Sequence, residues 1–265
     1  MTGPDRPTTA GLYDYFLGGR NGRPADRAAA QKLQAAVPEI PDAVRANRAF
    51  HGRAVRWMAG QGIGQFIDIG SGLPTQHNTH QVAHEVAPEA KVVYVDNDPM
   101  VAAQGGPLLA GDGTTTVITA DLRDPAGLLG QPALCSLIDF TAPAGVLMSA
   151  VVHFVADEDD PWRLVASYMA AVAPGSYLAL SHGTYDEMHT GKLRASRDVY
   201  ANSASGVHLR SRAEVERFFD GLDLVPHRPG AVPALTYVSR WGVPSQEVTD
   251  SEGARGVYCG VARRP

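Results

Sequence analysis

The chain has 265 residues, 44% of them hydrophobic, which is enough to bury one large core. Its net charge of −5 gives no overall basic surface, so neither nucleic acid nor an anionic membrane is favoured as a partner, and only a local basic patch is left open. Cys135 and Cys259 form no disulfide framework, the start of the chain lacks signal-peptide features, and no apolar run is long enough for a bilayer, so we expect a cytoplasmic protein.

The first 60 residues are predicted to be helical. Asp26 is placed to cap a helix over the segment RAAAQKLQAAV. Pro41 suits the first turn of a second helix. The apolar stripe of that helix consists of Phe50, Ala54, Trp57 and Met58. We therefore expect residues 1–60 to form a helical extension and residues 61–265 to form the main domain.

Residues 65–74 read QFIDIGSGLP, a short apolar strand that runs into a glycine-rich turn. Gly70 and Gly72 allow the backbone to turn sharply and to approach a ligand closely. Asp68 would repel the pyrophosphate of a nicotinamide or flavin dinucleotide, whose charge is about −2, but would attract the ammonium and sulfonium of S-adenosylmethionine. Thr75 also replaces the third glycine of the dinucleotide fingerprint. The alternative is an ordinary buried or capping aspartate.

Three histidines follow this turn, and His77, His80 and His84 would share one face of a helix. That face lies opposite Val82 and Val86, the positions that we expect to pack on the sheet. We therefore expect the histidines to face solvent and to bind no metal, because a stable site also needs a fourth ligand and supporting contacts.

Three further strands end in candidate ligand residues. The strand VVYVDND reaches Asp96, 26 residues after the first glycine of the turn and close to the ~20 expected for a ribose-binding acid, and Asn97 follows it. TVITADLRDP reaches Asp121, whose carboxylate could hold an adenine amino group while the backbone amide of Leu122 holds a ring nitrogen. AGVLMSAVVHFV leads into Ser149. Because open α/β sheets bind ligands at the carboxyl ends of their strands, we expect these residues to form one cofactor site.

The remaining elements complete the sheet. The acidic run 157–160 precedes Pro161, where helix capping is favoured over a metal site. SYLALSH is predicted to be the fifth strand, Ser211 and Glu214 form a capping box, and GVYCGVARR is predicted to be the final strand.

In this order, the turn IDIGSGLP and the strands VYVDNDP and ADLRDP resemble those of class I S-adenosylmethionine-dependent methyltransferases. YDYFLGG, RANRAF, FIDIGSGLPT, HFV before an acidic run, and SYLALSH resemble a bacterial subfamily catalogued as a domain of unknown function. The resemblance covers the chain from about Gly11 to the final strand. It implies a Rossmann-like α/β fold with a mostly parallel, seven-stranded sheet whose last strand is antiparallel, and S-adenosylmethionine as the cofactor.

The resemblance names no acceptor, and we expect a small molecule. Transfer from a sulfonium is an in-line displacement that neutralises positive charge, so positioning should dominate catalysis. His153 and His182 follow inner strands and are the candidate general bases, although each could equally be a hydrogen-bonded histidine at a strand end. Ala150 and Val151 supply no metal-binding acid at the exit of the fourth strand, so we expect metal-independent transfer.

The N-terminal segment is a candidate lid. Tyr13 and Tyr15 flank an acid and are expected to contact the cofactor, with Gly18 and Gly19 as a hinge. The polar segment 183–210 is a second candidate binding loop. The alternative is a packed N-terminal strap beside an idle surface loop.

Two other functions remain open at this point. One is a protein that binds S-adenosylmethionine or its product without turnover, as a sensor or partner. The other is an NAD-dependent oxidoreductase, which Asp68 and Thr75 disfavour.

Overall fold

The computed structural model describes residues 6–74, 77–109, 113–188, 190–201, 203, 206–244, 247–248 and 251–265. Within these ranges eight strands form one sheet in the order β3-β2-β1-β4-β5-β8-β6, with β7 pairing with β8. The strands are β1 (Gln65–Ile69), β2 (Lys91–Asp96), β3 (Thr115–Thr119), β4 (Gly145–Ser149), β5 (Tyr177–Gly183), β6 (Asp223–Leu224), β7 (Thr236–Tyr237) and β8 (Val257–Arg263).

The first five strands are parallel to one another, whereas β8 is antiparallel to β5, and β6 and β7 are antiparallel to β8. The predicted Rossmann-like sheet is therefore confirmed. One very short strand, β7, adds to the seven that were expected.

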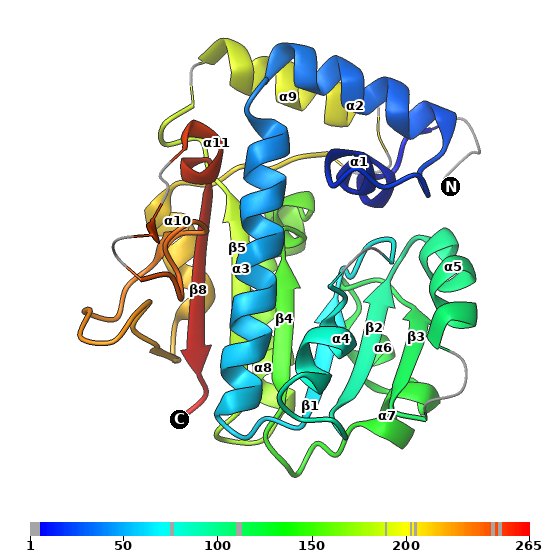
Figure 1. Ribbon diagram of the computed structural model, residues 1–265, viewed down its shortest axis with the longest axis vertical. Helices are drawn as coiled ribbons and strands as arrows, with labels where there is room; N and C mark the ends of the chain where they lie inside the picture. The colour runs from blue at the N-terminus through cyan, green and yellow to red at the C-terminus, as the bar shows by residue number, and fades with distance from the viewer. Residues whose placement is uncertain are drawn as a thin grey trace.

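Helices cover both faces of the sheet and one of its ends (Figure 1). The α-helices are α1 (Thr9–Phe16), α2 (Pro24–Ala36), α3 (Ile40–Gly60), α4 (Thr79–His84), α5 (Pro99–Leu109), α6 (Pro125–Leu129), α7 (Pro132–Leu137), α8 (Pro161–Ala171), α9 (Thr190–Ala201), α10 (Arg212–Glu216) and α11 (Glu252–Arg255). The short 3-10 helices are η1 (Val152–Phe154), η2 (Asp157–Asp159) and η3 (Arg217–Phe219). Figure 1 shows α1, α2 and α9 lying across the carboxyl ends of the parallel strands.

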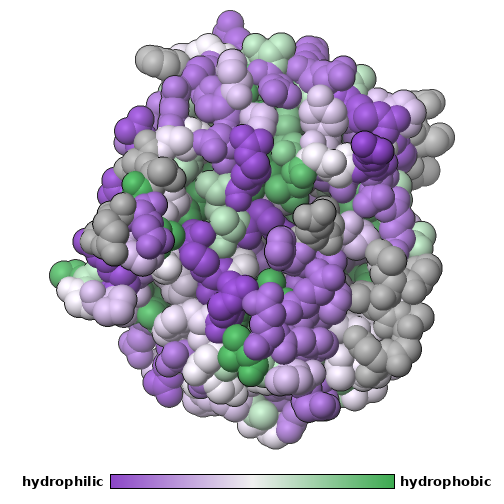
Figure 2. Space-filling view, in the orientation of Figure 1, coloured by the Kyte–Doolittle hydropathy of each residue, from purple (hydrophilic) through white to green (hydrophobic). Residues whose placement is uncertain are grey.

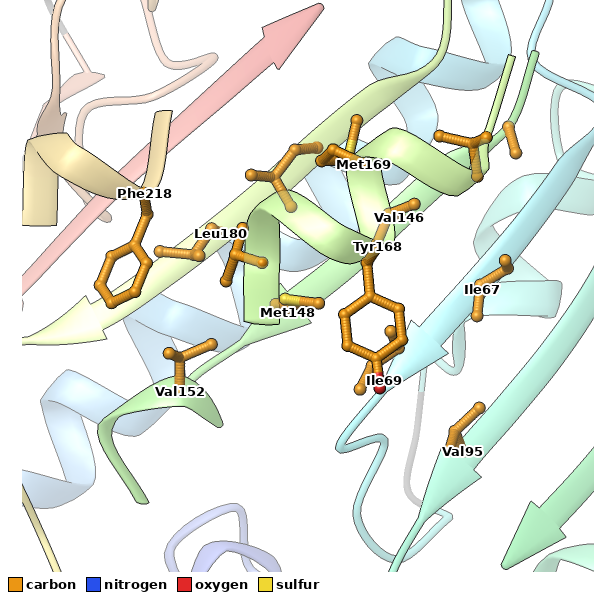
Figure 3. Packing of buried hydrophobic residues seen from close by; sticks show 14 of the residues in the cluster. Ile67, Ile69, Val95, Val146, Met148, Val152, Tyr168, Met169, Leu180 and Phe218 are labelled. Carbon is orange, nitrogen blue, oxygen red and sulfur yellow. The ribbon is translucent and has the colours of Figure 1, made fainter. Parts of the chain in front are cut away.

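The alternation of side chains along each strand divides the core in two. In β1, Ile67 and Ile69 pack with α8, while Phe66 packs with α3 and α4. Figure 3 shows the first of these layers, in which Tyr168 and Met169 of α8 lie over the sheet. Every second residue of β1, counted from Phe66, therefore faces α3. This alternation determines which side chains meet at the carboxyl ends of the strands.

The N-terminal helices are divided between two layers. Phe50, Ala54 and Met58 of α3 are fully buried against the sheet, as their predicted stripe requires. The helices α1, α2 and α9 instead share a separate small core around Leu12 and Leu33. The layer over the strand ends thus consists of α1, α2 and α9, and α3 belongs to the layer that covers the sheet.

Asp26 takes part in capping α2 as predicted, but as the third residue of the helix in a capping box and not as the cap residue itself. Arg23 is the cap residue of α2, and Asp26 is the third residue of the helix. Its carboxylate accepts hydrogen bonds from the backbone amides of Thr8 and Arg23, each at 2.7 Å. The cap lies earlier than expected because Pro24 takes a position in the first helical turn. Asp26 thereby ties the entry of α1 to α2.

The predicted solvent-facing stripe of three histidines is correct only in part: His77 is exposed, His80 and His84 have their rings in contact, and Val82 packs in the core, but His80 and His84 are half-buried. His77 lies before α4, with a φ of 58°. The His80 ring contacts the Tyr94 hydroxyl at 2.7 Å, and His84 Nε2 lies 2.9 Å from a backbone carbonyl oxygen. Val86 lies beyond the helix and is 42% exposed. The periodicity argument failed for His77 and Val86 because α4 is only six residues long and both positions lie outside it.

Other local predictions are confirmed. Asp160 caps α8 by accepting from the Arg163 amide, and Ser211 and Glu214 form the capping box of α10. None of the helices in the described ranges has the length and apolar character needed to cross a bilayer.

Candidate functional site

A cavity of about 600 Å³ lies at the carboxyl ends of β1, β2, β4 and β5, beneath the helical layer of α1, α2 and α9. The glycine turn and the ends of β2 and β4 contribute to its walls, as do α1, α3 and η1. In Figure 2, hydrophobic surface shows between hydrophilic side chains below the upper helices. The predicted convergence of strand ends on one binding site therefore matches the position of this cavity.

The glycine turn follows β1 and supports one wall of the cavity. Gly70 and Gly72 have φ values of 73° and 68°, which favour glycine. A Cβ atom at Gly70 would lie 2.2 Å from a methyl carbon of Val151, so no side chain fits there. A Cβ atom at Gly72 would meet no atom within 4 Å. Gly72 therefore leaves its backbone open to the cavity.

Asp96 connects the end of β2 to this turn. Its carboxylate accepts from the Gly72 amide at 2.8 Å and from the Asp98 amide at 2.9 Å. Burial raises the pKa of Asp96, and the two amides oppose this shift. Both Asp96 and the exposed Asn97 line the cavity, and a carboxylate has acceptor capacity beyond two bonds. Asp96 is thus a rigidly held acceptor, as a ribose-binding acid requires.

Asp121 and Leu122 also line the cavity, at the end of β3. The Asp121 carboxylate lies 2.5 Å from Nη2 of Arg123, and the bonds from Arg123 lower the pKa of Asp121. The sequence analysis did not predict this ion pair. The ion pair favours the ionised form of Asp121, and the contacts from the backbone and guanidinium N–H groups of Arg123 occupy most of the acceptor positions of this carboxylate.

Asp68 is buried at the end of β1 and lines the cavity. Thr79 Oγ1 donates to Asp68 Oδ2 at 2.5 Å. Burial raises the pKa of Asp68 to about 6, while the hydroxyl of Thr79 and the positive charge of Arg48 act in the opposite direction. Asp68 is therefore buried and also lines the cavity, and its contact with the cofactor stays a prediction.

Two residues of α3, which the sequence analysis missed, hold the strand ends together. The ring nitrogens of His51 lie 2.9 Å from Ser149 Oγ and 2.8 Å from Thr79 Oγ1. Asn47 Oδ1 accepts from Ser181 Oγ at 2.5 Å, and both α3 residues line the cavity. Because Asn47 and His51 are four residues apart, they continue the buried stripe of α3 towards its N-terminus. That spacing was the signal available in the sequence.

The two predicted tyrosines have different environments. Tyr13 lines the cavity, and its hydroxyl accepts from Asn47 Nδ2 at 2.8 Å. Tyr15 is not among the described residues that line the cavity, and its ring contacts Phe16 in the helical layer. The expected contact of Tyr15 with the cofactor therefore needs a correction. Because Tyr13 and Tyr15 are two positions apart on a helix, their side chains are rotated by about 200° around the helix axis and point to different sides.

Of the two candidate bases, only His153 lines the cavity. Its Nδ1 accepts from the Gly183 amide at 3.2 Å, which places the ring hydrogen on Nε2 of the neutral form. Burial lowers the pKa of His153 to about 3, with a further contribution from Arg210. His153 thus presents a donor and has no free lone pair with which to accept a proton.

His182 does not face the cavity, so its predicted role needs a correction. His182 is two positions after Leu180 in β5, so it faces the same side of the sheet as Leu180. Its ring packs beside Phe218, on the side that α8 covers. Arg210 Nη1 lies 2.8 Å from Nε2 of His182, and burial keeps the pKa of the ring well below its usual value. His182 is therefore the hydrogen-bonded core histidine that was its alternative interpretation.

No cluster of three or more histidine, cysteine, aspartate or glutamate side chains arranged to hold a metal occurs among the residues that the structure describes. Within the acidic run, Asp157 pairs with Arg210 at 2.6 Å and Asp160 caps α8. These acids thus have structural partners.

The cavity wall suits S-adenosylmethionine. Asp68 supplies negative charge, Asp96 supplies acceptors, and Gly72 leaves backbone open. Ser71 Oγ and Asp98 Oδ2 are buried at the same wall and have no hydrogen-bond partner among the described atoms. Unsatisfied buried groups of this kind fit a ligand with hydroxyl and ammonium groups. When bound, S-adenosylmethionine supplies a methyl group on a positively charged sulfur.

Comparison with known proteins supports this interpretation. The family described as S-adenosyl methyltransferase matches residues 3–265. A candidate methyltransferase from Thermobifida fusca YX is 38% identical, with a TM-score of 0.89 over 98% of this chain and 96% of that one. A DUF574 family protein from Streptomyces avermitilis is 39% identical, with a TM-score of 0.90 over 98% of both chains. No curated protein matches the chain.

A more distant structure shares the fold. The N-methyltransferase NodS from Bradyrhizobium japonicum, in complex with S-adenosylhomocysteine, is 11% identical, with a TM-score of 0.51 over 82% of this chain and 87% of that one. At this identity the likeness concerns the fold alone. The match over nearly the whole chain decides the family: the protein belongs to the S-adenosyl methyltransferases and is an S-adenosylmethionine-dependent methyltransferase.

Proposed function

We propose that this methyltransferase acts on a small-molecule acceptor and needs no metal ion. The observation that carries the proposal is the extent of the cavity. The cavity continues past the strand ends that suit the cofactor into a second region with apolar walls. These walls are formed by the α2–α3 junction, by η1, by α9 and by the segment before α10. Representative lining residues are Val37, Val44, Phe154, Tyr200 and Val207.

The size of the cavity supports a small acceptor. A volume of about 600 Å³ lies within the range of roughly 300 to 1,000 Å³ typical of small-molecule sites. The helices α1, α2 and α9 lie over the strand ends, as Figure 1 shows, so a folded macromolecule would have to displace them. Apolar and aromatic walls suit an acceptor with a largely apolar body.

The first test is methyl transfer in the presence of a chelator. We expect the purified enzyme to move label from methyl-labelled S-adenosylmethionine into a low-mass metabolite extract, with less than a twofold change when EDTA is added. The reason is that two of the acids that line the cavity already have partners, because Asp96 accepts from two backbone amides and Asp121 accepts from Arg123. Loss of transfer that Mg²⁺ or Zn²⁺ restores would contradict metal independence, and label found only in protein or nucleic acid would contradict a small acceptor.

We also propose that α1 closes over the bound cofactor. Tyr13 lines the cavity from α1, and Gly18 follows the helix with a φ of 80°. Amide exchange across residues 13–20 should therefore slow at least several-fold when S-adenosylhomocysteine binds, while exchange in α8 stays unchanged as the internal control. Equal protection with and without the ligand would favour a fixed strap and contradict closure.

A further inference from the structure

Four polar side chains beside the cavity form one continuous hydrogen-bonded chain. Ser149 Oγ lies 2.9 Å from His51 Nδ1, and His51 Nε2 lies 2.8 Å from Thr79 Oγ1. Thr79 Oγ1 donates to Asp68 Oδ2 at 2.5 Å. The four residues come from β4, α3, α4 and β1 respectively, so the fold assembles the chain from distant parts of the sequence.

The direction of every bond in this chain follows from its last member. An ionised carboxylate can only accept, so the hydroxyl of Thr79 must donate to Asp68. Thr79 then receives the Nε2 hydrogen of His51. The Nδ1 atom of His51 is consequently the acceptor for the hydroxyl of Ser149. Ser149, which lines the cavity, is left with lone pairs as the groups it can offer to a ligand.

The interior of the chain carries no net charge. His51 and Thr79 are 3% and 0% exposed. Burial and, to a smaller extent, the neighbouring positive charge of Arg48 together lower the pKa of His51 to about 3, so the ring is neutral near pH 7. A neutral imidazole can accept at one nitrogen while it donates from the other, which is the property that a proton relay needs.

Ser149 lies between the two halves of the cavity. The strand β4 pairs with β1 on one side and with β5 on the other. Asp68 and Asp96 lie on the β1 and β2 side, whereas His153 and Phe154 follow β4 and face the apolar part of the cavity. Ser149 is therefore at the junction where a donor group and an acceptor molecule must meet.

We propose that Ser149, His51, Thr79 and Asp68 form a proton relay that takes the proton from an acceptor carrying a hydroxyl or an amine. This inference rests on the proposed function and narrows the acceptor to molecules with an O–H or N–H group. Ser149 contacts the acceptor, and the other three residues act through Ser149.

The transfer balances in atoms and charge. The acceptor gains a carbon–oxygen or carbon–nitrogen bond, while the carbon–sulfur bond breaks and its electron pair stays on sulfur. The acceptor's proton passes to Ser149 Oγ as the Ser149 proton passes to His51 Nδ1. The Nε2 proton of His51 passes to Thr79, and the proton of Thr79 passes to Asp68. After the transfer, Asp68 is a neutral carboxylic acid, and each hydrogen bond among the four residues has exchanged its donor and its acceptor.

The surroundings of Asp68 suit this terminal role. Burial raises the pKa of Asp68 to about 6, so the group can hold a proton near neutral pH. From the helix α4, the hydroxyl of Thr79 donates to Asp68, and the ring of His80, which contacts the Tyr94 hydroxyl, lines a smaller cavity together with Asp68. The titratable and charged groups that face Asp68 from the other elements are Tyr13 on α1, Arg48 and His51 on α3, and Tyr94 and Asp96 on β2.

The relay has a spectroscopic signature that needs no acceptor. Protonation of Asp68 reverses the chain, so His51 should change from the Nε2–H to the Nδ1–H tautomer without becoming charged. Nitrogen NMR of the full chain labelled in its histidine rings, titrated from pH 8 to pH 5, follows both nitrogens of His51. We expect the two resonances to exchange character around the pH at which Asp68 titrates.

Variants of Thr79 separate a relay from simple packing. Thr79→Val keeps the shape of the side chain but has no hydroxyl, and should abolish the tautomer change in a folded protein. Thr79→Ser restores the hydroxyl and should restore the change. A single His51 tautomer from pH 8 to pH 5 in the unaltered protein, protonation of both nitrogens together, or a change that persists in Thr79→Val would overturn the relay.

The result is distinguishable from a failure of the proposed function. The tautomer measurement uses the protein without acceptor or metal, whereas the acceptor size and metal independence are tested by label transfer with EDTA. If the tautomer stays fixed while label still enters a small molecule, the relay is wrong and the proposed function stands.

Discussion

Replacing Asp96 by alanine is expected to weaken the binding of S-adenosylmethionine and S-adenosylhomocysteine equally, by about 1.5 to 3 kcal/mol or roughly 10- to 150-fold. Both ligands carry the same ribose hydroxyls, and the Asp96 carboxylate is the held acceptor at the end of β2. The variant also loses the bond to the Gly72 amide, so the turn itself becomes less ordered. Isothermal titration calorimetry of the two ligands measures the effect.

Asp139→Ala is the matched control. Asp139 is exposed, and its carboxylate accepts from the backbone amide and the hydroxyl of Thr141. It lies beside Gln65, at the amino end of β1 and away from the cavity. The affinity of the Asp139→Ala variant for both ligands should equal that of the unaltered protein. Unchanged affinity in folded Asp96→Ala would remove Asp96 from the site.

The glycine turn gives the second large effect, through two substitutions that differ in one contact. Gly70→Ala and Gly72→Ala share a strained positive φ, which costs about 1 to 2 kcal/mol for alanine. Only the Gly70 side chain would collide with Val151, adding about 1 to 3 kcal/mol. Gly70→Ala should therefore lower the free energy of unfolding by roughly 2 to 5 kcal/mol.

Gly72→Ala should instead act mainly on ligand binding. Its new methyl group would occupy open space at the cavity wall, so stability falls by no more than about 1 to 2 kcal/mol while affinity for S-adenosylhomocysteine falls about tenfold or more. Chemical unfolding and calorimetry on the same two variants separate the effects. Equal losses of stability in both variants would show that the turn is not packed against Val151 as the structure has it.

The strand ends were predictable because their signals are local. A β-branched run that stops at an acid indicates a buried parallel strand with a polar group at its carboxyl end, and this placed Asp68, Asp96, Asp121 and Ser149 along one cavity. The alternation of side chains along a strand could also have been used at the sequence level. Ser181 and His182 are adjacent in β5 and must face opposite sides, so both strand-end residues of β5 could not serve one site.

The polar contacts of α3 were not predictable to the same degree. The four-residue spacing of Asn47 and His51 indicates a shared buried face, but it does not name their partners. His51 meets Ser149 across 98 positions of sequence, and Asn47 meets Ser181 across 134. Those pairings depend on how α3 crosses the sheet, which is set by packing throughout the core rather than by local pattern.

The most direct test of the account is a crystal structure of the protein with S-adenosylhomocysteine. We expect the ribose at Asp96, the adenine near Asp121 and the sulfur towards Ser149, with the apolar region at Phe154 and Tyr200 left open for an acceptor. A cofactor that fills the apolar region, or an α1 helix that occupies it, would leave no room for an acceptor. Either result would contradict methyl transfer to a small molecule in this cavity and favour a protein that binds the cofactor without turnover.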